Sequence, residues 1–476
     1  MHKEGQSDSP IPGAPGGPPQ PNTEAAKVSF VSLGCPKALV DSEHIVTALQ
    51  DSGYQVVAED DQDAQVVVIN TCGFIDAAKQ ESIDAISRAY ADERQVVVTG
   101  CMGKDPAELQ DQFTQLLSIS GPAEVQPVMD AVQTYLPPLP GRSAGFSGQP
   151  GIPGQRIRLT PEHYAYLKIS EGCNHKCAFC IIPQMRGKLR SRDITEVLEE
   201  AQTLVADGVK ELLVVAQDLS AYGVDLGYRT SLHGQREIPA RLYELCESLG
   251  QIAPWVRLHY VYPYPHVDAV IPLMRDGLLL PYLDMPLQHA SVPLLKQMRR
   301  PAATAKTLER IQRWRELCPE LVIRSTFIVG FPGETDEDLG ELLDFLQAAE
   351  LDRVGCFTYS AVDGAAANKL DDHVDESVKL DRQEMVYELQ SGISAKRLQR
   401  HVGTSLRVLV DEVDQNGQAV ARSFADAPEI DGLVHVTGDK QAAVQAGEFA
   451  WVQIDRADDH DLYGHFTGRA VQLSDS

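Results

Sequence analysis

Long apolar runs and targeting segments are missing from this chain of 476 residues. No run approaches the roughly 20 apolar residues that a membrane-spanning helix needs. The first 26 residues are rich in proline and glycine, and they show neither the apolar core of a signal peptide nor the arginine-rich pattern of a transit peptide. We therefore expect a disordered tail over residues 1–26, no membrane partner and a cytoplasmic location.

Positive charge is also scarce. The chain has 42 Lys and Arg residues against 68 Asp and Glu residues, which gives a formal net charge of −26. A mainly negative surface repels phosphate backbones and attracts basic macromolecules, so direct binding to nucleic acid is disfavoured. High negative charge can also serve solubility alone.

A fourth cysteine is missing from the densest cysteine cluster, CNHKCAFC, which holds Cys173, Cys177 and Cys180. Structural zinc sites and electron-transfer iron–sulfur clusters usually take four protein ligands. Nine cysteines, an odd number in a chain without an export signal, argue against a disulfide framework and favour metal or cluster ligation. Three thiolates can hold three irons of a 4Fe-4S cluster and leave the fourth iron open to a small molecule. Zinc with His175 as a fourth ligand is the alternative, although the spacing is unlike that of paired CxxC knuckles.

Strand-like runs that alternate with helical patterns predict a parallel α/β sheet domain over residues 27–135. The three runs are VSFVSL from Val28, VVVIN to Asn70 and VVVT to Thr99. A Pro/Gly-rich segment follows, and we expect it to be a linker over residues 136–158.

The alternation resumes in a second α/β domain, expected over residues 159–398. Its strand-like runs are AYLKI, LLVVA, WVRLHY, LVIRSTFIV and VGCFTY. About six βα units fit a complete or partial barrel, which places its chemistry at the carboxyl ends of the strands. Residues 399–476 change to short alternating strands with Gly-rich turns, which predicts a small all-β module.

Three scattered cysteines each follow one of the three runs of the first domain. Cys35, Cys72 and Cys101 stand in SLGC, INTC and VTGC. Because the carboxyl ends of parallel strands share one edge of a sheet, we expect these thiols to converge on a second site, again with three ligands. The alternative is that each is a small buried hydrophobic residue. The remaining cysteines match no motif, and we expect them to serve packing: Cys246, Cys318 and Cys356.

The CxxxCxxC spacing in EGCNHKCAFCIIPQMRGKLRSR resembles the signature of the radical S-adenosylmethionine enzymes. The resemblance implies that the open iron binds S-adenosylmethionine, which one-electron reduction cleaves to a 5′-deoxyadenosyl radical. It also implies three cofactor contacts: Phe179 with adenine, Gln217 and Asp218 with the methionine amino group, and Arg324 with the carboxylate. Packing would explain Phe179, and a buried ion pair would explain Arg324 nearly as well.

The segments LGCPKALVDSE, INTCGFIDAAKQESID and VTGCM resemble the N-terminal domain of the methylthiotransferases, which holds a second 4Fe-4S cluster associated with the sulfur to be inserted. The domain order resembles that family over nearly all of the chain after residue 27, and the final module is similar to a TRAM domain, an OB-like barrel. This module binds tRNA in the tRNA-modifying branch. From Gly403 to Ser476, however, it has 13 acidic and 5 basic residues, a net charge of −8, which suits a basic protein better than RNA.

The segments VAQDLSAYG, LDMPLQHAS and RSFADAPEIDG resemble the branch that modifies a ribosomal protein. The resemblance implies methylthiolation of the β-carbon of an aspartate in small-subunit ribosomal protein S-twelve, which is strongly basic. One S-adenosylmethionine would methylate sulfur at the first cysteine site and a second would be cleaved at CNHKCAFC. The implied cofactors are two 4Fe-4S clusters and S-adenosylmethionine, and the implied reductant is a carrier such as a flavodoxin or ferredoxin.

One local departure from the family stands out, because Asp363, Gly364 and Ala365 occupy a place where relatives often have Glu-Gly-Thr. Two other functions stay open. A tRNA (adenosine) methylthiotransferase would need a basic patch in the final module, and a non-enzymatic iron–sulfur redox protein would need fully ligated clusters.

Overall fold

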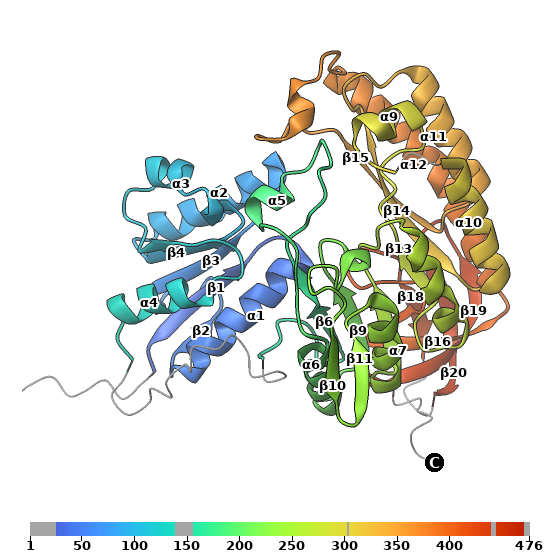
Figure 1. Ribbon diagram of the computed structural model, residues 1–476. Helices are drawn as coiled ribbons and strands as arrows, with labels where there is room; N and C mark the ends of the chain where they lie inside the picture. The colour runs from blue at the N-terminus through green and yellow to red at the C-terminus, as the bar shows by residue number, and fades with distance from the viewer. Residues whose placement is uncertain (1–24, 139–155, 302–303, 439–443, 471–476) are drawn as a thin grey trace, which may run out of the picture.

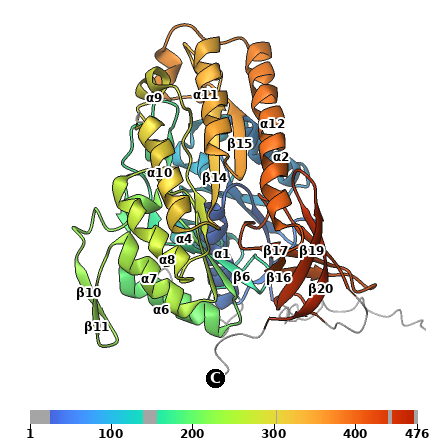
Figure 2. The same cartoon turned by 90° about the vertical axis from the view of Figure 1, so that its right-hand side faces the viewer.

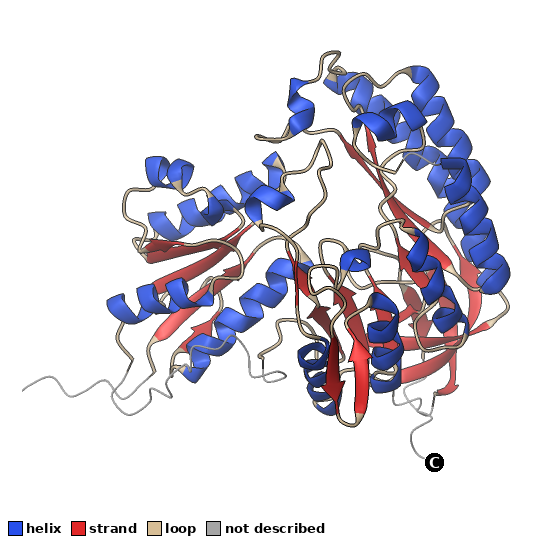
Figure 3. Ribbon diagram, in the orientation of Figure 1, coloured by secondary structure: helices blue, strands red, loops and turns tan. Residues whose placement is uncertain are grey.

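The computed structural model describes residues 25–138, 156–301, 304–438 and 444–470 (Figure 1). These residues form an N-terminal parallel sheet with helices on both faces, a six-stranded parallel sheet with its own helices, and a small closed β-barrel (Figure 3). The predicted fold class is therefore confirmed. Most of the expected N-terminal tail and of the linker over residues 136–158 lies outside the described residues.

The N-terminal sheet has the strand order β2-β1-β3-β4-β5, and all of its strand pairs are parallel. Its strands are β1 Lys27–Ser32, β2 Gln55–Val57, β3 Val66–Thr71, β4 Gln95–Gly100 and β5 Ser118–Ile119. Its helices are α1 Pro36–Asp51, α2 Asp76–Ala91, α3 Ala107–Gln112 and α4 Val125–Tyr135. Helices α1 and α4 bury one face of the sheet, and α2 and α3 bury the other. Because both faces are covered, the central strand β3 is buried along its whole length, and its first four residues, Val66 to Ile69, are apolar.

The second sheet has the strand order β15-β14-β13-β12-β9-β6 and is open, so it forms a partial barrel. Its strands are β6 Tyr164–Lys168, β9 Glu211–Val215, β12 Trp255–Leu258, β13 Tyr282–Asp284, β14 Val322–Val329 and β15 Arg353–Thr358. Two further strand pairs flank it: β7 Ser170–Glu171 with β8 Arg190–Ser191, and the hairpin β10 Thr230–His233 with β11 Arg236–Pro239. Its helices are α5 Ile182–Met185, α6 Ile194–Ala206, α7 Leu242–Ile252, α8 Ile271–Arg275, α9 Val292–Gln297, α10 Thr304–Leu317, α11 Asp336–Ala349 and α12 Glu376–Leu398.

Alternate side chains of these strands separate a helix-covered face from an inner face. Ala165 and Leu167 pack with the apolar sides of helices such as α6 and α7, whereas Tyr164, Tyr166 and Lys168 point to the inner side. Capping residues determine where helices begin. At the start of α6, the Asp193 carboxylate accepts a hydrogen bond from the Thr195 N–H at 3.0 Å. Figure 2 shows the long helices standing side by side along the outer face of the sheet.

The C-terminal module is a closed barrel with the strand order β16-β17-β18-β20-β19. Its strands are β16 Ser405–Val413, β17 Ala419–Ser423, β18 Val434–Thr437, β19 Phe449–Ala457 and β20 Leu462–Arg469. It packs against the amino ends of the partial-barrel strands, where Trp255, Tyr282 and Val322 contact Leu409 and Phe449.

A buried charge network fixes the same contact. Glu211, the first residue of β9, accepts a hydrogen bond from Arg257 Nε at 2.7 Å and also pairs with Arg422 of the module. Arg353, the first residue of β15, pairs with Asp426 at 2.8 Å. The module therefore covers the amino end of the partial barrel and leaves the carboxyl ends of the strands for a site.

Among the described residues, no helix combines the length and the apolar character that crossing a bilayer requires.

Candidate active site

The structure brings Cys35, Cys72 and Cys101 together at the carboxyl edge of the N-terminal sheet. They follow the neighbouring strands β1, β3 and β4. The thiols of Cys35 and Cys72 both lie near enough to influence the pKa of Cys101, and Cys35 also influences that of Cys72. The Cys101 N–H donates to the Thr71 carbonyl at 3.0 Å, which continues the pairing of β3 and β4 up to the thiols. A rule about parallel sheets thus united three cysteines that no sequence spacing connects.

Gly100 makes this close approach possible. It has φ +96°, and a Cβ built at this residue would lie 2.5 Å from the Thr71 carbonyl oxygen. An L side chain would meet both a strained backbone conformation and a clash with backbone atoms there. Glycine directly before Cys101 therefore holds this thiol against the end of β3.

The environment of this first trio is cationic. Burial alone would raise the pKa of Cys35, but Lys37 and Arg186 lower it below its ordinary value. Burial raises the pKa of Cys101 to about 11, against a smaller opposing effect of Arg186. Nearby cations favour thiolates, the form in which cysteine binds iron. Three thiols beside two buried cations fit an anionic iron–sulfur group.

The second trio lies in the loop after β6 and β7. The Cys173 N–H donates to the Gly187 carbonyl at 3.1 Å, and the Cys180 N–H donates to the Cys177 carbonyl at 3.2 Å. All three thiols are partly exposed. Burial nevertheless raises the pKa of Cys173 to about 11 and that of Cys180 to about 12.

Each sulfur of the second trio accepts a hydrogen bond from an N–H group. The backbone N–H of His175 donates to one sulfur at 3.4 Å, and that of Ile182 donates to another at 3.5 Å. The Arg300 guanidinium donates to Cys177 Sγ at 3.8 Å. Hydrogen bonds to sulfur are a main way in which proteins tune iron–sulfur clusters, so this donor set fits a cluster held by three cysteines. Within the described ranges, no three His, Cys, Asp or Glu side chains are placed to hold a single metal ion.

One short segment connects the two trios. Ile181 and Met185, which follow Cys180, pack against Cys101 of the first trio. Ala365 completes this apolar cluster and is 3% exposed, and the Gln184 amide donates to the neighbouring Gly364 carbonyl at 3.1 Å. The loop that departs from the family pattern therefore lies at the junction of the two sites.

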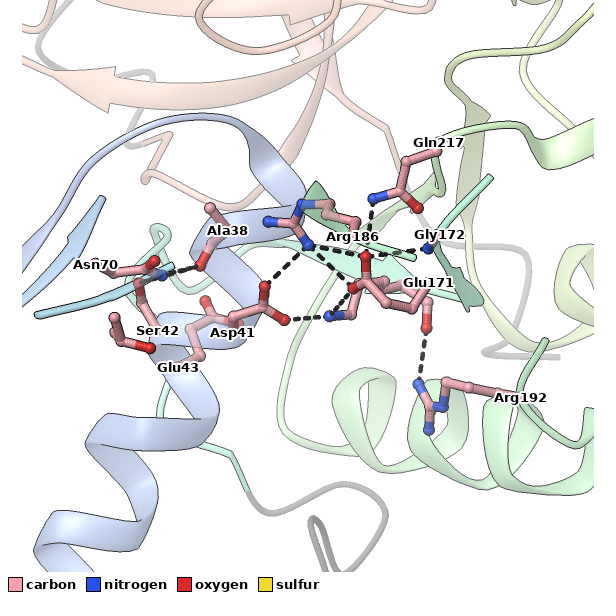
Figure 4. A network of polar contacts seen from close by, with 12 residues as sticks. Ala38, Asp41, Ser42, Glu43, Asn70, Glu171, Gly172, Arg186, Arg192 and Gln217 are labelled. Atoms are coloured by element: carbon pink, nitrogen blue, oxygen red, sulfur yellow. Dashed lines mark hydrogen bonds and ion pairs between the residues drawn. The ribbon is translucent and has the colours of Figure 1, made fainter. Parts of the chain in front are cut away.

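A buried polar network lies beside this junction (Figure 4). Arg186 Nη1 lies 3.2 Å from a carboxylate oxygen of Asp41 on α1 and 3.0 Å from Glu171. Lys168 pairs with the same two carboxylates. Burial would raise the pKa of Glu171, but Lys168 and Arg186 lower it to about 2. The network ties the N-terminal domain to the strand that leads into the cysteine loop.

The three predicted cofactor contacts have different surroundings. Phe179 packs against the apolar cluster that contains Met298 and Phe331. Gln217 donates to Glu171 at 3.1 Å, and its buried Oε1 has no hydrogen-bond partner among the described residues. These two contacts stay predictions.

The third predicted contact, Arg324, is already engaged by carboxylates. It lies 3.2 Å from Asp284 and 3.4 Å from Asp431 of the C-terminal module. The ion pair that was the alternative explanation is thus present, and the cofactor role of Arg324 stays a prediction.

Sequence reasoning missed several polar residues around the cysteines. Glu171 and Arg186 flank the cysteine loop, and their position in EGC and MRG was a signal that could have drawn attention to them. Arg300 comes from the distant segment QMRRP, and nothing in its spacing points to Cys177. The unassigned cysteines are buried: Cys246 is in α7, Cys318 follows α10 and Cys356 is in β15.

Family models match three stretches of the chain. Residues 27–121 match the uncharacterized protein family UPF0004, residues 167–346 the radical SAM superfamily, and residues 402–466 the TRAM domain. Among solved structures, the radical S-adenosylmethionine methyltransferase TsrM from Kitasatospora setae covers 70% of this chain and 72% of its own at 16% identity, with a TM-score of 0.49. That likeness is too distant to add to the argument.

Curated relatives are much closer. A protein from Saccharophagus degradans named ribosomal protein uS12 methylthiotransferase RimO is 56% identical over 455 residues, which is 94% of each chain. A protein of the same name from Chromobacterium violaceum is 57% identical over 438 residues, 92% of this chain and 98% of its own. With its two cysteine trios and its three matched domains, the chain belongs to the family of ribosomal protein uS12 methylthiotransferases, within the radical SAM superfamily.

Proposed function

We propose that this protein methylthiolates the β-carbon of an aspartate in ribosomal protein uS12, with two 4Fe-4S clusters and S-adenosylmethionine as cofactors. The observation that carries the proposal is the pair of cysteine trios at the carboxyl ends of two parallel sheets, joined by the buried side chains of Ile181 and Met185. The high identity to proteins named uS12 methylthiotransferases supports the substrate.

The two trios have separate roles in this proposal. Cys173, Cys177 and Cys180 hold the cluster at which S-adenosylmethionine is cleaved, and the trio at the edge of the N-terminal sheet holds the cluster associated with the transferred sulfur. When bound, the cluster at the second trio and S-adenosylmethionine supply the one-electron chemistry that removes hydrogen from an unactivated carbon. Arg300 and two backbone N–H groups orient the thiolates of that site.

The remaining residues of the site bind S-adenosylmethionine and determine where the substrate enters. Phe179 offers an apolar surface beside the third cysteine for the adenine ring, and the unpartnered Oε1 of Gln217 is an acceptor for the amino group of methionine. The C-terminal module covers the amino end of the partial barrel, so the aspartate of the substrate enters at the carboxyl ends of the strands.

The charge of the protein supports the remaining parts of the proposal. An acidic C-terminal module and a net charge of −26 favour a basic protein substrate over direct nucleic-acid binding. The site needs a one-electron reductant, for which a flavodoxin or ferredoxin is suited, and a ribosomal protein as substrate supports a cytoplasmic location.

The test uses anaerobic, reduced protein with S-adenosylmethionine and uS12. We expect release of 5′-deoxyadenosine and a mass gain of one methylthio group on uS12. Cys177→Ala should abolish both, whereas Cys101→Ala should abolish the mass gain and retain 5′-deoxyadenosine release. Cys356→Ala, in a buried cysteine of β15, is the matched control and should retain both. Release of 5′-deoxyadenosine by Cys177→Ala would refute the assignment of the radical site.

Unmodified tRNA, incubated under the same conditions, tests the alternative substrate. Methylthiolation of tRNA with no change in the mass of uS12 would move this protein to the tRNA-modifying branch.

A further inference from the structure

A cavity of about 400 Å³ reaches Cys173 of the second cysteine trio. Cys173, His175, Asp218 and Tyr264 are among the residues that line it. Asp218 Oδ2 lies 2.7 Å from the ring nitrogen of His175, whereas the preceding Gln217 points to the interdomain network and does not line the cavity. Of the residues proposed to bind S-adenosylmethionine, neither Phe179 nor Gln217 lines this cavity.

The rings of His175, Tyr264 and His266 line this cavity, and Tyr262, which does not line it, packs against His175 and Tyr264. His266 and Tyr264 have ring centroids 5.7 Å apart, and Tyr264 and Tyr262 have centroids 4.9 Å apart. Tyr262 stacks on His175 at 4.1 Å with the two planes only 5° apart. The lining rings and Tyr262 thus form a continuous series of π systems.

This series continues to a sulfur of the cysteine trio. The Arg300 guanidinium lies 3.9 Å from the centroid of the Tyr262 ring, and Arg300 Nη1 lies 3.8 Å from Cys177 Sγ. Because His175 occupies one face of Tyr262, Arg300 occupies the other. Closely packed groups therefore connect the cavity wall to a predicted cluster ligand.

Exposed cations surround the cysteine loop in an otherwise acidic protein. Lys176 lies within the loop, and Lys188 and Arg190 lie on the segment that pairs with it: Arg190 is the partner of Glu171 between β7 and β8. All three cations are exposed, and none forms an ion pair with a carboxylate of the described residues. The exposed Asp225 at this edge accepts hydrogen bonds from Ser191. We call Lys176, Lys188 and Arg190 the basic rim.

We propose that the basic rim and the ring-lined cavity form the docking surface for the reductant, an acidic protein that carries one electron. This inference rests on the proposed function, because it requires a cluster at the second trio. In the transfer, the carrier loses one electron and the cluster site gains it, while no bond forms or breaks in this protein. The basic rim repels the basic substrate uS12, so substrate and reductant approach through surfaces of opposite charge.

The test measures how fast a reduced flavodoxin is oxidised by the reconstituted protein at low ionic strength. The double variant Lys188→Glu with Arg190→Glu should lower the second-order rate about tenfold and weaken its dependence on salt, because electrostatic steering changes association rates by about 10 to 1,000-fold. The neutral pair Lys188→Gln with Arg190→Gln should give an intermediate rate. Lys210→Glu reverses one positive charge next to the amino end of β9, away from the basic rim, and should leave the rate unchanged.

Dithionite, a small chemical reductant, separates docking from damage to the site. The double variant should retain its iron content and, with dithionite, its 5′-deoxyadenosine release and its methylthiolation of uS12. The proposal is overturned if the double variant oxidises flavodoxin as fast as Lys210→Glu does. It is also overturned if 5′-deoxyadenosine release by the double variant with dithionite falls as much as its rate with flavodoxin. It is also overturned if the variant loses binding of a single-stranded RNA while its flavodoxin rate is kept, since the rim would then be a nucleic-acid surface. Failure of the proposed function would give a different result: the unaltered protein would not methylthiolate uS12 even with dithionite.

Discussion

Replacing Arg186 by glutamine should destabilise the junction between the N-terminal domain and the partial barrel. The Arg186 side chain is 1% exposed and contacts Asp41, which is 3% exposed, and Glu171, which is 11% exposed. The two acidic residues come from different domains. Without the guanidinium, two buried carboxylates would share the single ammonium group of Lys168.

The expected loss follows from the burial of these charges. Removing one partner of a buried ion pair typically costs about 3–5 kcal/mol, because the other charge stays buried without compensation. The pKa of Glu171 gives the same order of magnitude. Its shift from 4.5 to about 2 corresponds to about 3 kcal/mol of preference for the charged form, and Lys168 provides part of that. We therefore expect Arg186→Gln to lower the free energy of unfolding by about 3 kcal/mol.

Urea denaturation followed by circular dichroism measures this loss in reconstituted and in iron-free protein. Arg88→Gln is the matched control, because Arg88 and its partner Glu59 are 59% and 41% exposed, and such pairs contribute about 0–1 kcal/mol. Adding Asp41→Asn to Arg186→Gln should restore part of the stability, since it removes the uncompensated charge. A loss below about 1 kcal/mol, or no recovery with Asp41→Asn, would refute the reasoning.

Four smaller predictions concern other residues. Gly100→Ala should lower iron content by about half, because a Cβ there clashes with the backbone beside one trio and leaves the other intact, and an unchanged iron content would contradict this. Gly340→Ala in α11 has no atom within 4 Å of the new Cβ and should raise stability by up to about 1 kcal/mol in the same denaturation assay. Burial would raise the pKa of Glu200, but Arg156 and Arg192 lower it to about 2. The free energy of unfolding should therefore fall by up to about 1.4 kcal/mol per pH unit as the pH drops from 4.5 towards 2. Glu200→Gln should reduce this fall, whereas the exposed Glu199→Gln should leave it unchanged. Cys246→Ala should cost about 1–2 kcal/mol and leave iron content and 5′-deoxyadenosine release unchanged, whereas a loss of iron would show that this fully buried thiol does more than pack.

The parts of the fold that the sequence predicted are those with strong local signals. Runs rich in β-branched residues identified β3, β4 and β14. The first cysteine trio followed from the rule that the carboxyl ends of parallel strands share one edge of the sheet. Strand β13, with the three residues Tyr282–Asp284, was missed because it is too short for any periodicity to appear. The edge strands β2 and β5 were missed for the same reason.

Contacts between domains were beyond prediction from the sequence. Arg186 and Asp41 are 145 residues apart, and Arg324 meets Asp431 of another domain. A charged residue that is buried needs a partner of opposite charge, but the sequence around it does not identify that partner. This is why the cysteines could be placed at sites from sequence while the polar network that joins the sites could not.

The position of the C-terminal module has a consequence for how this protein can be divided. Deleting the module would expose the apolar rings of Trp255 and Tyr282 to solvent. It would also leave the carboxylate of Glu211 with only one of its two arginine partners. A shortened enzyme would thus lose the packing that covers the amino end of its partial barrel as well as a recognition surface. Any exchange of this module between relatives must carry over an arginine equivalent to Arg422 and an apolar underside, and a swap that preserves only the outer charge should yield insoluble protein.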